Sequence, residues 1–522
     1  MAKALMIQGT GSGVGKSLIV AGLCRLFRNR GVNVAPFKAQ NMALNSFITR
    51  EGGEIGRAQA LQAEAAGVEP SVDMNPILLK ATSEAGCQVI KHGRVHANMG
   101  ARAYYAYKDE AWAAVTESFD RLSKKHELIV IEGAGSPAEI NLSKEEVVNM
   151  SIARYAQASV ILVGDIDKGG VFASLYGTIA LLDGDADYIK AFIINKFRGD
   201  MTILEPGLHM IREKTGRPVL GVIPYLGDLG LHEEDGIPLE RIDQFKRFNQ
   251  FKPVKIVVLR LRYISNFTDF DPFIYEPGVE LVYSLRPEDI ENADAVIIPG
   301  SKNTVNDLLF LKEHGIAESV KRAVEKGVMV IGVCGGYQML GRKLFDPCGI
   351  ESVHKEVDGL GLLDVETVFE ESKVTSQVEA VAVRSWEFGA RSSEDKGKEI
   401  LKGYEIHMGR TIGEIGLFDV KRISSNSELR TQPALECLYQ GNFELVRDGS
   451  IKGNTWGTYI HGIFDNDRFR RGLINSLRIK RGLEPVEAAV DYTKLRDEAL
   501  DKWTKVLSTH VDIEYIENLL KV

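Results

Sequence analysis

The chain has 522 residues, and its 64 basic and 72 acidic side chains give a net charge of −8. A hydrophobic content of 44% with 26% charged residues excludes a wholly disordered chain, and the acid excess argues against a surface that coats nucleic acid. Five cysteines without regular spacing exclude a disulfide framework and favour a cytoplasmic location. No targeting signal is evident, and the apolar runs fall short of the ~20 residues that span a bilayer.

Short apolar runs alternate with longer amphipathic segments along the chain, which is typical of parallel α/β architecture. A charged stretch at residues 228–253 marks the expected main boundary. We therefore expect domains at 1–245 and 251–470, and a helical C-terminal appendix at 471–522. The expected strands are 4–7, 32–36, 128–131, 160–163, 191–194 and 219–223 in the first half, then 254–259, 295–298 and 328–332, followed by strand-rich sequence to residue 459.

A glycine-rich segment lies between the first expected strand and an expected helix at 18–30. Glycines let backbone N–H groups turn toward phosphate oxygens, Lys16 reaches the β- and γ-phosphates, and the Ser17 hydroxyl binds Mg²⁺. Thr10 occupies the usual position of the leading glycine, so the loop is one residue longer than the common form. The segment predicts a P-loop for ATP, whose nucleotide-binding residues are Gly9, Thr10, Gly11, Ser12, Gly13, Val14, Gly15, Lys16 and Ser17.

Three further polar side chains follow buried strands of the first half. Because ligands of open α/β sheets bind at the carboxyl edge, Glu132 is predicted to associate with the metal together with Ser17. Asp165 either joins this site or caps a turn. Asn195 either contacts the nucleotide base or belongs to an ordinary polar turn.

A second signal is a cysteine on a sharp turn between an apolar strand and a helix. Cys334 is followed by Gly335 and Gly336, and small neighbours are what a strained nucleophile turn requires. Its base is expected far downstream, and His461 is preferred to His407, which either contacts substrate or satisfies backbone groups. Cysteine and histidine together suit attack on a carboxamide through a thioester, and the turn at residues 299–301 is expected to supply an oxyanion N–H.

The residues now support a family resemblance. The motif at 332–338 (GVCGGYQ) resembles the nucleophile motif of class I glutamine amidotransferases, and residues 9–17 with 132–135 resemble dethiobiotin-synthetase-like P-loop enzymes. Joined in this order, they resemble the cobyrinic and cobyric acid amide synthases of cobalamin biosynthesis. The stretches that resemble the cobyric acid branch are 37–46, 264–272, 299–304 and 403–407.

The resemblance implies an α/β fold with an N-terminal P-loop, dethiobiotin-synthetase-like parallel sheet and a C-terminal class I glutamine amidotransferase-like domain. It implies a ligase that uses ATP and glutamine to amidate the b, d, e and g carboxylates of adenosylcobyrinic acid a,c-diamide, giving adenosylcobyric acid. Ammonia would come from glutamine hydrolysis at Cys334, with His461 as the second catalytic residue. The implied cofactors are ATP and Mg²⁺, and the partners are small molecules rather than nucleic acid or membrane.

The sequence departs from the family pattern at one catalytic position. Most class I glutaminases carry a glutamate two residues after the catalytic histidine, where this chain has Ile463. Either Asp465 substitutes for it, or the site runs as a Cys–His dyad.

Other interpretations remain open. The chain could be the related a,c-diamide synthase, or a cysteine hydrolase with an accessory nucleotide domain. It could also be a P-loop partition-type ATPase with an inactive glutaminase-like module, although such ATPases usually place a second lysine where this chain has Gly11. The loop after the second strand either binds substrate carboxylates or amides or is a solvated turn; its polar residues are Lys38, Gln40, Asn41, Asn45 and Ser46.

Overall fold

The computed structural model describes residues 2–81, 86–141, 146–227, 229–231, 252–383, 399–423, 443–487 and 490–521. The chain forms two compact units and passes between them more than once. Most of the expected boundary at 228–253 lies outside the described residues. Unit 1 comprises Met1–Ala43, Glu54–Gly236 and Lys494–Val522, and unit 2 comprises Leu44–Gly53 and Ile237–Thr493.

Unit 1 contains a six-stranded sheet in the order β12-β11-β10-β1-β9-β2, and every neighbouring pair is parallel. The phosphate loop leaves β1 near the centre of this sheet. The six strands expected from the first half are thereby confirmed. They are β1 (Lys3–Gly9), β2 (Val34–Phe37), β9 (Leu128–Glu132), β10 (Ser159–Asp165), β11 (Ile189–Phe197) and β12 (Val219–Pro224).

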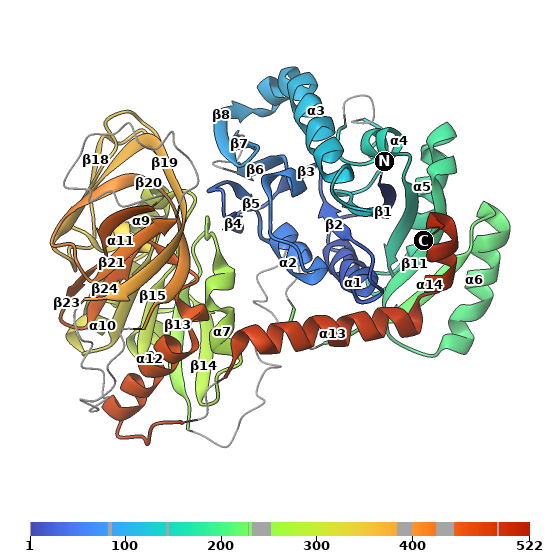
Figure 1. Ribbon diagram of the computed structural model, residues 1–522. Helices are drawn as coiled ribbons and strands as arrows, with labels where there is room; N and C mark the ends of the chain where they lie inside the picture. The colour runs from blue at the N-terminus through green and yellow to red at the C-terminus, as the bar shows by residue number, and fades with distance from the viewer. Residues whose placement is uncertain are drawn as a thin grey trace. The chain divides into compact units, whose positions relative to one another are not determined.

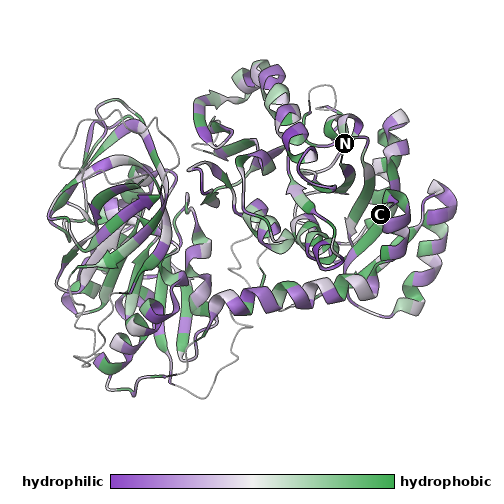
Figure 2. Cartoon of the chain, viewed as in Figure 1, coloured by the Kyte–Doolittle hydropathy of each residue, from purple (hydrophilic) through white to green (hydrophobic). Residues whose placement is uncertain are grey.

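This sheet is buried on both faces, which explains why its strands are continuous apolar runs. Along β1, Ala4 and Met6 belong to one hydrophobic core, and Leu5 and Ile7 belong to the other. Figure 2 shows the strands as largely hydrophobic, whereas α6 and α13 alternate hydrophobic and hydrophilic residues. The first core contains residues of α3 (Ala101–Ser123), α4 (Met150–Ala156), α5 (Val171–Leu181) and α6 (Met201–Thr215), and the second contains residues of α1 (Lys16–Asn29), α13 (Tyr492–His510) and α14 (Ile513–Leu520).

A smaller four-stranded sheet of unit 1, ordered β3-β6-β7-β8, was not among the expected elements. Its strands are short, and β8 is mostly exposed, so the sequence there lacks a long apolar run. The helix α2, which lies between β3 and β6 in the chain, supplies side chains to the phosphate site. These elements are β3 (Gln40–Met42), β5 (Glu54–Gly56), α2 (Arg57–Ala66), β6 (Ile77–Ala81), β7 (Gly86–Lys91) and β8 (Arg94–Gly100).

Unit 2 contains a second six-stranded sheet, in the order β14-β13-β15-β16-β24-β23. All its neighbouring pairs are parallel except β23 with β24. The expected strands of this half are confirmed, and β14 is an addition to them. The strands are β13 (Val254–Leu259), β14 (Val279–Ser284), β15 (Ala295–Ile298), β16 (Met329–Val333), β23 (Ser450–Lys452) and β24 (Thr455–Thr458), and the helices are α7 (Asp271–Ile274), α8 (Pro287–Glu291), α9 (Thr304–Glu313), α10 (Ile316–Glu325), α11 (Gly335–Leu340) and α12 (Asp467–Lys480).

The strand-rich sequence after residue 361 forms most of a further, mainly antiparallel sheet of unit 2. Both sheets contribute to one continuous hydrophobic core. The members of the further sheet are β17 (Lys343–Phe345), β18 (Glu356–Asp358), β19 (Val365–Ala382), β20 (Leu401–Gly413), β21 (Phe418–Ile423), β22 (Phe443–Asp448) and β25 (Ile460–His461).

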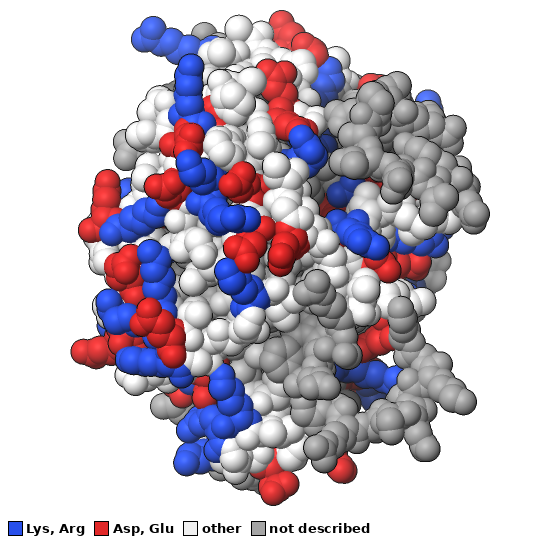
Figure 3. Space-filling view, turned by 90° about the vertical axis from the view of Figure 1, so that its left-hand side faces the viewer, with Lys and Arg blue, Asp and Glu red and all other residues white. Residues whose placement is uncertain are grey.

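The charged side chains on the face drawn in Figure 3 are of mixed sign. Lysine and arginine are interspersed with aspartate and glutamate there, and the described residues form no continuous field of one sign. Within the described ranges, no helix combines the length and the apolarity that crossing a membrane requires.

The end of the chain is part of the core of unit 1. Helix α13, red in Figure 1, buries Trp503 against α1, and the indole Nε1 donates a hydrogen bond to the Leu18 carbonyl. Arg25 of α1 forms ion pairs with Asp497 and Asp501 of the same helix. The last thirty or so residues therefore cover one face of the nucleotide-site sheet.

Trp503→Ala should destabilise unit 1 strongly. Removing this indole leaves a cavity beside α1 and removes its hydrogen bond to the Leu18 carbonyl, and large-to-small core changes of this kind cost about 3–5 kcal/mol. Urea unfolding followed by circular dichroism measures the change, with exposed Lys505→Ala on the same helix as the control. Equal stability of the two variants would contradict a structural role for the tail.

Candidate functional site

The phosphate loop of unit 1 follows β1 and leads into α1. Gly13 and Gly15 have φ values of +69° and +96°, a region that favours glycine because it lacks a Cβ atom. Lys16 Nζ donates to the Gly11 carbonyl at 2.8 Å and to the Gly135 carbonyl at 3.4 Å. The ammonium group thus lies across the loop, and its contact with phosphate stays a prediction.

Asn195 supports this loop from β11. Its Nδ2 donates to the Val14 carbonyl at 2.8 Å, and a Cβ added to Gly15 would lie 2.3 Å from the same nitrogen. Its Oδ1 accepts from the Lys196 N–H. Both ends of the amide therefore have partners within the protein, and a contact of Asn195 with the nucleotide base stays a prediction.

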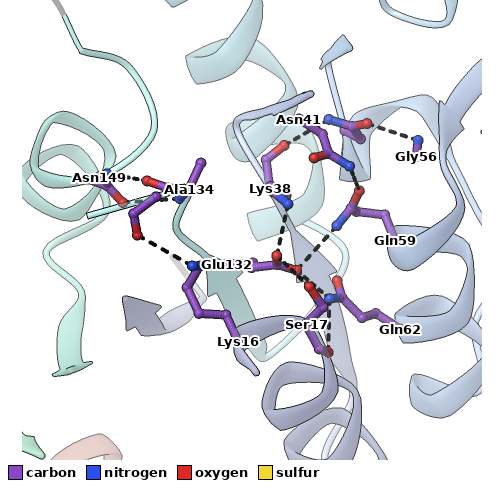
Figure 4. Close-up of polar contacts among 12 residues, drawn as sticks. Lys16, Ser17, Lys38, Asn41, Gly56, Gln59, Gln62, Glu132, Ala134 and Asn149 are labelled. Atoms are coloured by element: carbon purple, nitrogen blue, oxygen red, sulfur yellow. Dashed lines mark hydrogen bonds and ion pairs between the residues drawn. The ribbon is translucent and has the colours of Figure 1, made fainter. Parts of the chain in front are cut away.

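Figure 4 shows a cluster of polar side chains around Glu132 at the end of β9. Oε1 accepts from the Ser17 hydroxyl at 2.8 Å and pairs with Lys38 Nζ at 2.9 Å. Oε2 accepts from Nε2 of both Gln59 and Gln62, which lie on α2. These two glutamines were not among the predicted site residues, although their spacing of three residues places them on one face of a helix.

The Glu132 carboxylate is held in its charged form. Burial alone would raise its pKa, but Lys38 and the hydrogen bonds from Gln62 and Ser17 outweigh burial and lower it. A charged carboxylate next to a hydroxyl fits Mg²⁺, which takes few protein oxygens and completes its shell with phosphates and water. The described part of the chain has no group of three or more His, Cys, Asp or Glu suited to a metal, and the association of Mg²⁺ with Ser17 and Glu132 stays a prediction.

The other polar residues predicted near this edge separate into different environments. Asp165 accepts from the Asp167 N–H and lies 3.6 Å from Lys196 Nζ. Asn41 Nδ2 donates to Gln59 and so joins the Glu132 cluster. Asn45 and Ser46 instead belong to unit 2, where Asn45 Oδ1 accepts from the Phe267 N–H and the Ser46 N–H donates to Asn266.

The Cys334 turn of unit 2 has the strained backbone that the sequence predicted. Its φ is +52° and its ψ is −110°, which non-glycine residues rarely adopt. Gly336 is required next to it, because an added Cβ would lie 1.9 Å from the Ile298 carbonyl oxygen. The thiol donates to the Ile406 carbonyl at 3.4 Å. The turn thus presents Sγ between β20 and the end of β15.

His461 lies beside this thiol, as predicted for the base. Gly300, on the loop after β15, is also close, since a Cβ added there would lie 3.3 Å from His461 Cε1. The partner of the histidine is Asp269, whose Oδ2 lies 2.6 Å from His461 Nδ1, and Asp269 Oδ1 accepts from the Gly462 N–H at 3.2 Å. The expectations for this position were Asp465 as a substitute carboxylate or a Cys–His dyad, and the structure instead places Asp269 against the imidazole Nδ1.

Asp269 controls the charge of the imidazole. Burial alone would lower the pKa of His461, but Asp269 and Cys334 more than compensate and raise it to about 10. Because this exceeds the ordinary value of 6.5, protonated His461 contributes stability that is fully present below pH 6.5 and is lost as the pH rises toward 10. The arrangement favours an imidazolium next to the thiol.

His407 of β20 lies in the same region and remains neutral. Its pKa is lowered to about 4, chiefly by burial, while Glu405 opposes the shift. Nδ1 lies 3.1 Å from the Gly409 carbonyl and the ring stacks on Tyr459, whereas the buried Nε2 has no hydrogen-bond partner within the described residues. The backbone role predicted for His407 is thus visible, and the substrate role stays a prediction.

Comparison with known proteins assigns each half of the chain. Residues 5–239 match the model of the CobQ/CobB/MinD/ParA nucleotide binding domain, and residues 255–469 match that of the CobB/CobQ-like glutamine amidotransferase domain. A cobyric acid synthase of Thermodesulfovibrio yellowstonii is 50% identical over 99% of both chains. The chain belongs to the cobyric acid synthase family. Relatives with the same name from Syntrophobacter fumaroxidans and Caldanaerobacter subterraneus are 46% and 45% identical, and each alignment covers at least 99% of both chains.

Membership of the cobyric acid synthase family fixes the class of chemistry. The chain is an ATP-dependent, glutamine-hydrolysing amide ligase with a P-loop domain and a glutamine amidotransferase domain. The family resemblance drawn from residues 9–17 and 332–338 is therefore confirmed. Within it, the Asp269–His461 pair is a feature that the motifs did not reveal.

Asp269→Asn should lower glutaminase kcat about 10³-fold, because the imidazolium loses its counter-charge and the ring can adopt the wrong tautomer. Glutamate release measures the rate. The stability lost in this variant should be largest below pH 6.5 and should shrink toward pH 10, since only the protonated histidine is stabilised by the carboxylate. Asp465→Asn, at the alternative carboxylate, is the control and should stay within about twofold; a larger loss there than in Asp269→Asn would contradict the assignment.

Proposed function

We propose that this chain converts adenosylcobyrinic acid a,c-diamide to adenosylcobyric acid. It amidates the b, d, e and g carboxylates of the diamide with glutamine and ATP. The observation that supports this most is full-length similarity to cobyric acid synthases combined with two sites whose side chains suit the two halves of the reaction. Lys16, Ser17 and Glu132 suit activation of a carboxylate, and Cys334 and His461 suit release of ammonia.

Cys334 would generate the nitrogen donor. Its sulfur attacks the side-chain carbonyl carbon of glutamine, His461 transfers a proton to the leaving nitrogen, and ammonia departs. Water then hydrolyses the thioester, which releases glutamate and regenerates the Cys334 thiol. We assign backbone N–H groups at the Gly300 turn to the oxyanion, because this loop lies against His461.

The phosphate site would prepare the acceptor. A corrinoid carboxylate oxygen attacks the γ-phosphorus of ATP, ADP leaves, and ammonia then displaces phosphate from the resulting acyl phosphate to form the amide. Such transfers depend on positioning and on neutralising phosphate charge, for which Lys16 and Lys38 are suitably placed. Mg²⁺ held by Ser17 and Glu132 would neutralise further charge on the phosphate oxygens.

Incubation of the purified protein with the a,c-diamide, glutamine and Mg-ATP tests the proposal. We expect mass spectrometry to show four added amide groups per corrinoid. Cobyrinic acid offered instead should be a poor substrate, because its a and c carboxylates are not yet amidated. Those two carboxylates are the ones on which the related a,c-diamide synthase acts. A gain of two amides from cobyrinic acid and none from the a,c-diamide would identify the a,c-diamide synthase, and ATP hydrolysis without any amidation would favour a partition-type ATPase.

Two substitutions separate the halves of the reaction. Cys334→Ala should abolish synthesis from glutamine and retain it from ammonium salts, because only the nitrogen donor is lost. Lys16→Ala should abolish synthesis from either nitrogen source, because the carboxylate is no longer activated. Product formation with each source is the measurement, and normal glutamine hydrolysis by Cys334→Ala would contradict the assignment of the nucleophile.

A further inference from the structure

Ten residues of the first half of the sequence, Leu44–Gly53, belong to unit 2 by their contacts. They follow β3 and precede β5, both of which lie in unit 1. The segment includes β4 (Ser46–Ile48) and is held along β19, where Thr375 Oγ1 donates to the Gly52 carbonyl at 2.7 Å and Gln377 Nε2 donates to the Ile48 carbonyl. It is therefore an integral part of the glutaminase unit.

The segment fixes the turn that carries Asp269. Asn45 Oδ1 accepts from the Phe267 N–H at 3.1 Å, and Asn266 Oδ1 accepts from the Ser46 N–H at 2.9 Å. The two asparagine residues, 4% and 2% exposed, thus bond each other's neighbours reciprocally. Because Phe267–Phe270 is a single 3-10 turn, holding its first N–H holds Asp269 two residues later.

The same segment also supports the face of the imidazole. Tyr404 donates its hydroxyl proton to the Ser46 carbonyl at 3.1 Å, and its ring stacks on His461 with centroids 5.3 Å apart and planes 18° apart. Phe47 packs against Tyr404 from the segment side, at 5.7 Å between centroids. His461 is thus held at its Nδ1 edge by Asp269 and at one face by Tyr404, and both supports are anchored on three consecutive residues of the segment.

We propose that Leu44–Gly53 positions the catalytic histidine of the glutaminase, with Asn45 as a positioning residue that acts on His461 through the Phe267–Asp269 turn. The proposal rests on glutamine hydrolysis by Cys334 and His461, as proposed above. Its distinctive content is that a residue encoded in the nucleotide-binding half, remote in sequence from both catalytic residues, sets the rate of glutamine hydrolysis.

Asn45→Ala should lower glutaminase kcat about tenfold and leave the KM for glutamine within twofold, because one buried hydrogen bond is lost at the turn and none at the thiol. Synthesis from ammonium salts should be unchanged, which also shows that the variant is folded. The alkaline limb of the kcat–pH profile should move to lower pH, because a looser Asp269 stabilises the imidazolium less. The other titratable groups facing His461, which the substitution leaves in place, are Cys334, Tyr404, Glu405 and His407.

Two further variants sharpen the test. Thr375→Val removes a hydrogen bond from the far end of the same segment and should change kcat by less than twofold. Asn266→Gly removes the reciprocal bond without backbone strain, since φ there is +52°, and should reproduce Asn45→Ala. The double variant Asn45→Ala/Asn266→Gly should lose little more than either single one, because the two bonds act as a unit.

The outcomes distinguish this proposal from the function on which it rests. Wild-type kcat and an unshifted pH profile in Asn45→Ala would overturn the positioning role, as would equal losses with glutamine and with ammonium. If the wild-type chain synthesises product from ammonium but does not hydrolyse glutamine, the proposed nucleophile fails and the positioning role fails with it. If neither nitrogen source gives product while glutamine is hydrolysed, only the proposed acceptor is wrong, and the kcat comparison still decides the role of Asn45.

Discussion

A carboxylate and an imidazole, both almost wholly buried, lie 2.6 Å apart in the glutaminase unit. Burial alone would lower the pKa of His461, but Asp269 and Cys334 raise it to about 10. The pair thus holds the imidazole as a cation beside the Cys334 thiol. The reciprocal asparagine contacts reach the turn that carries Asp269, and Tyr404 stacks on His461, so each member of the pair is contacted from outside.

The phosphate site also depends on one buried acid. Here the acid is Glu132, and its partners are hydrogen-bond donors and the cation of Lys38. Glu132 is buried at the end of β9, the neighbour of the edge strand β2, and receives donors from the phosphate loop, the loop after β2 and the helix α2. Each donor comes from a different stretch of sequence, so the carboxylate holds these stretches together before any nucleotide binds. In each unit one buried acid, Asp269 or Glu132, holds the polar side chains of its site next to one another. The α/β sheet supplies the edge at which these side chains meet.

The features that could be predicted from the sequence are those that a local residue pattern specifies. The sheet strands were predictable because burial on both faces makes them continuous apolar runs, and the turns at Gly15 and Cys334 were predictable because their chemistry restricts residue type and spacing. Asp269 was not, because it lies in a short turn without periodicity and 192 residues before its histidine. That Asn45 belongs to unit 2 could not be predicted either, because its neighbours in sequence, such as Asn41, belong to unit 1.

The route of the chain restricts how this protein could be divided. Unit 1 is assembled from three separate stretches, and Leu500, Trp503 and Leu507 of the last stretch are packed in its core. A gene split at the middle of the coding sequence would give a front product that lacks α13 and α14 on the face of the sheet that α1 also covers. The rear product would carry these two helices without the core in which they pack. To encode the two units as separate subunits, the sequence of the terminal helices would first have to be moved to the gene for the front half. The path of the chain therefore favours keeping both units in one polypeptide.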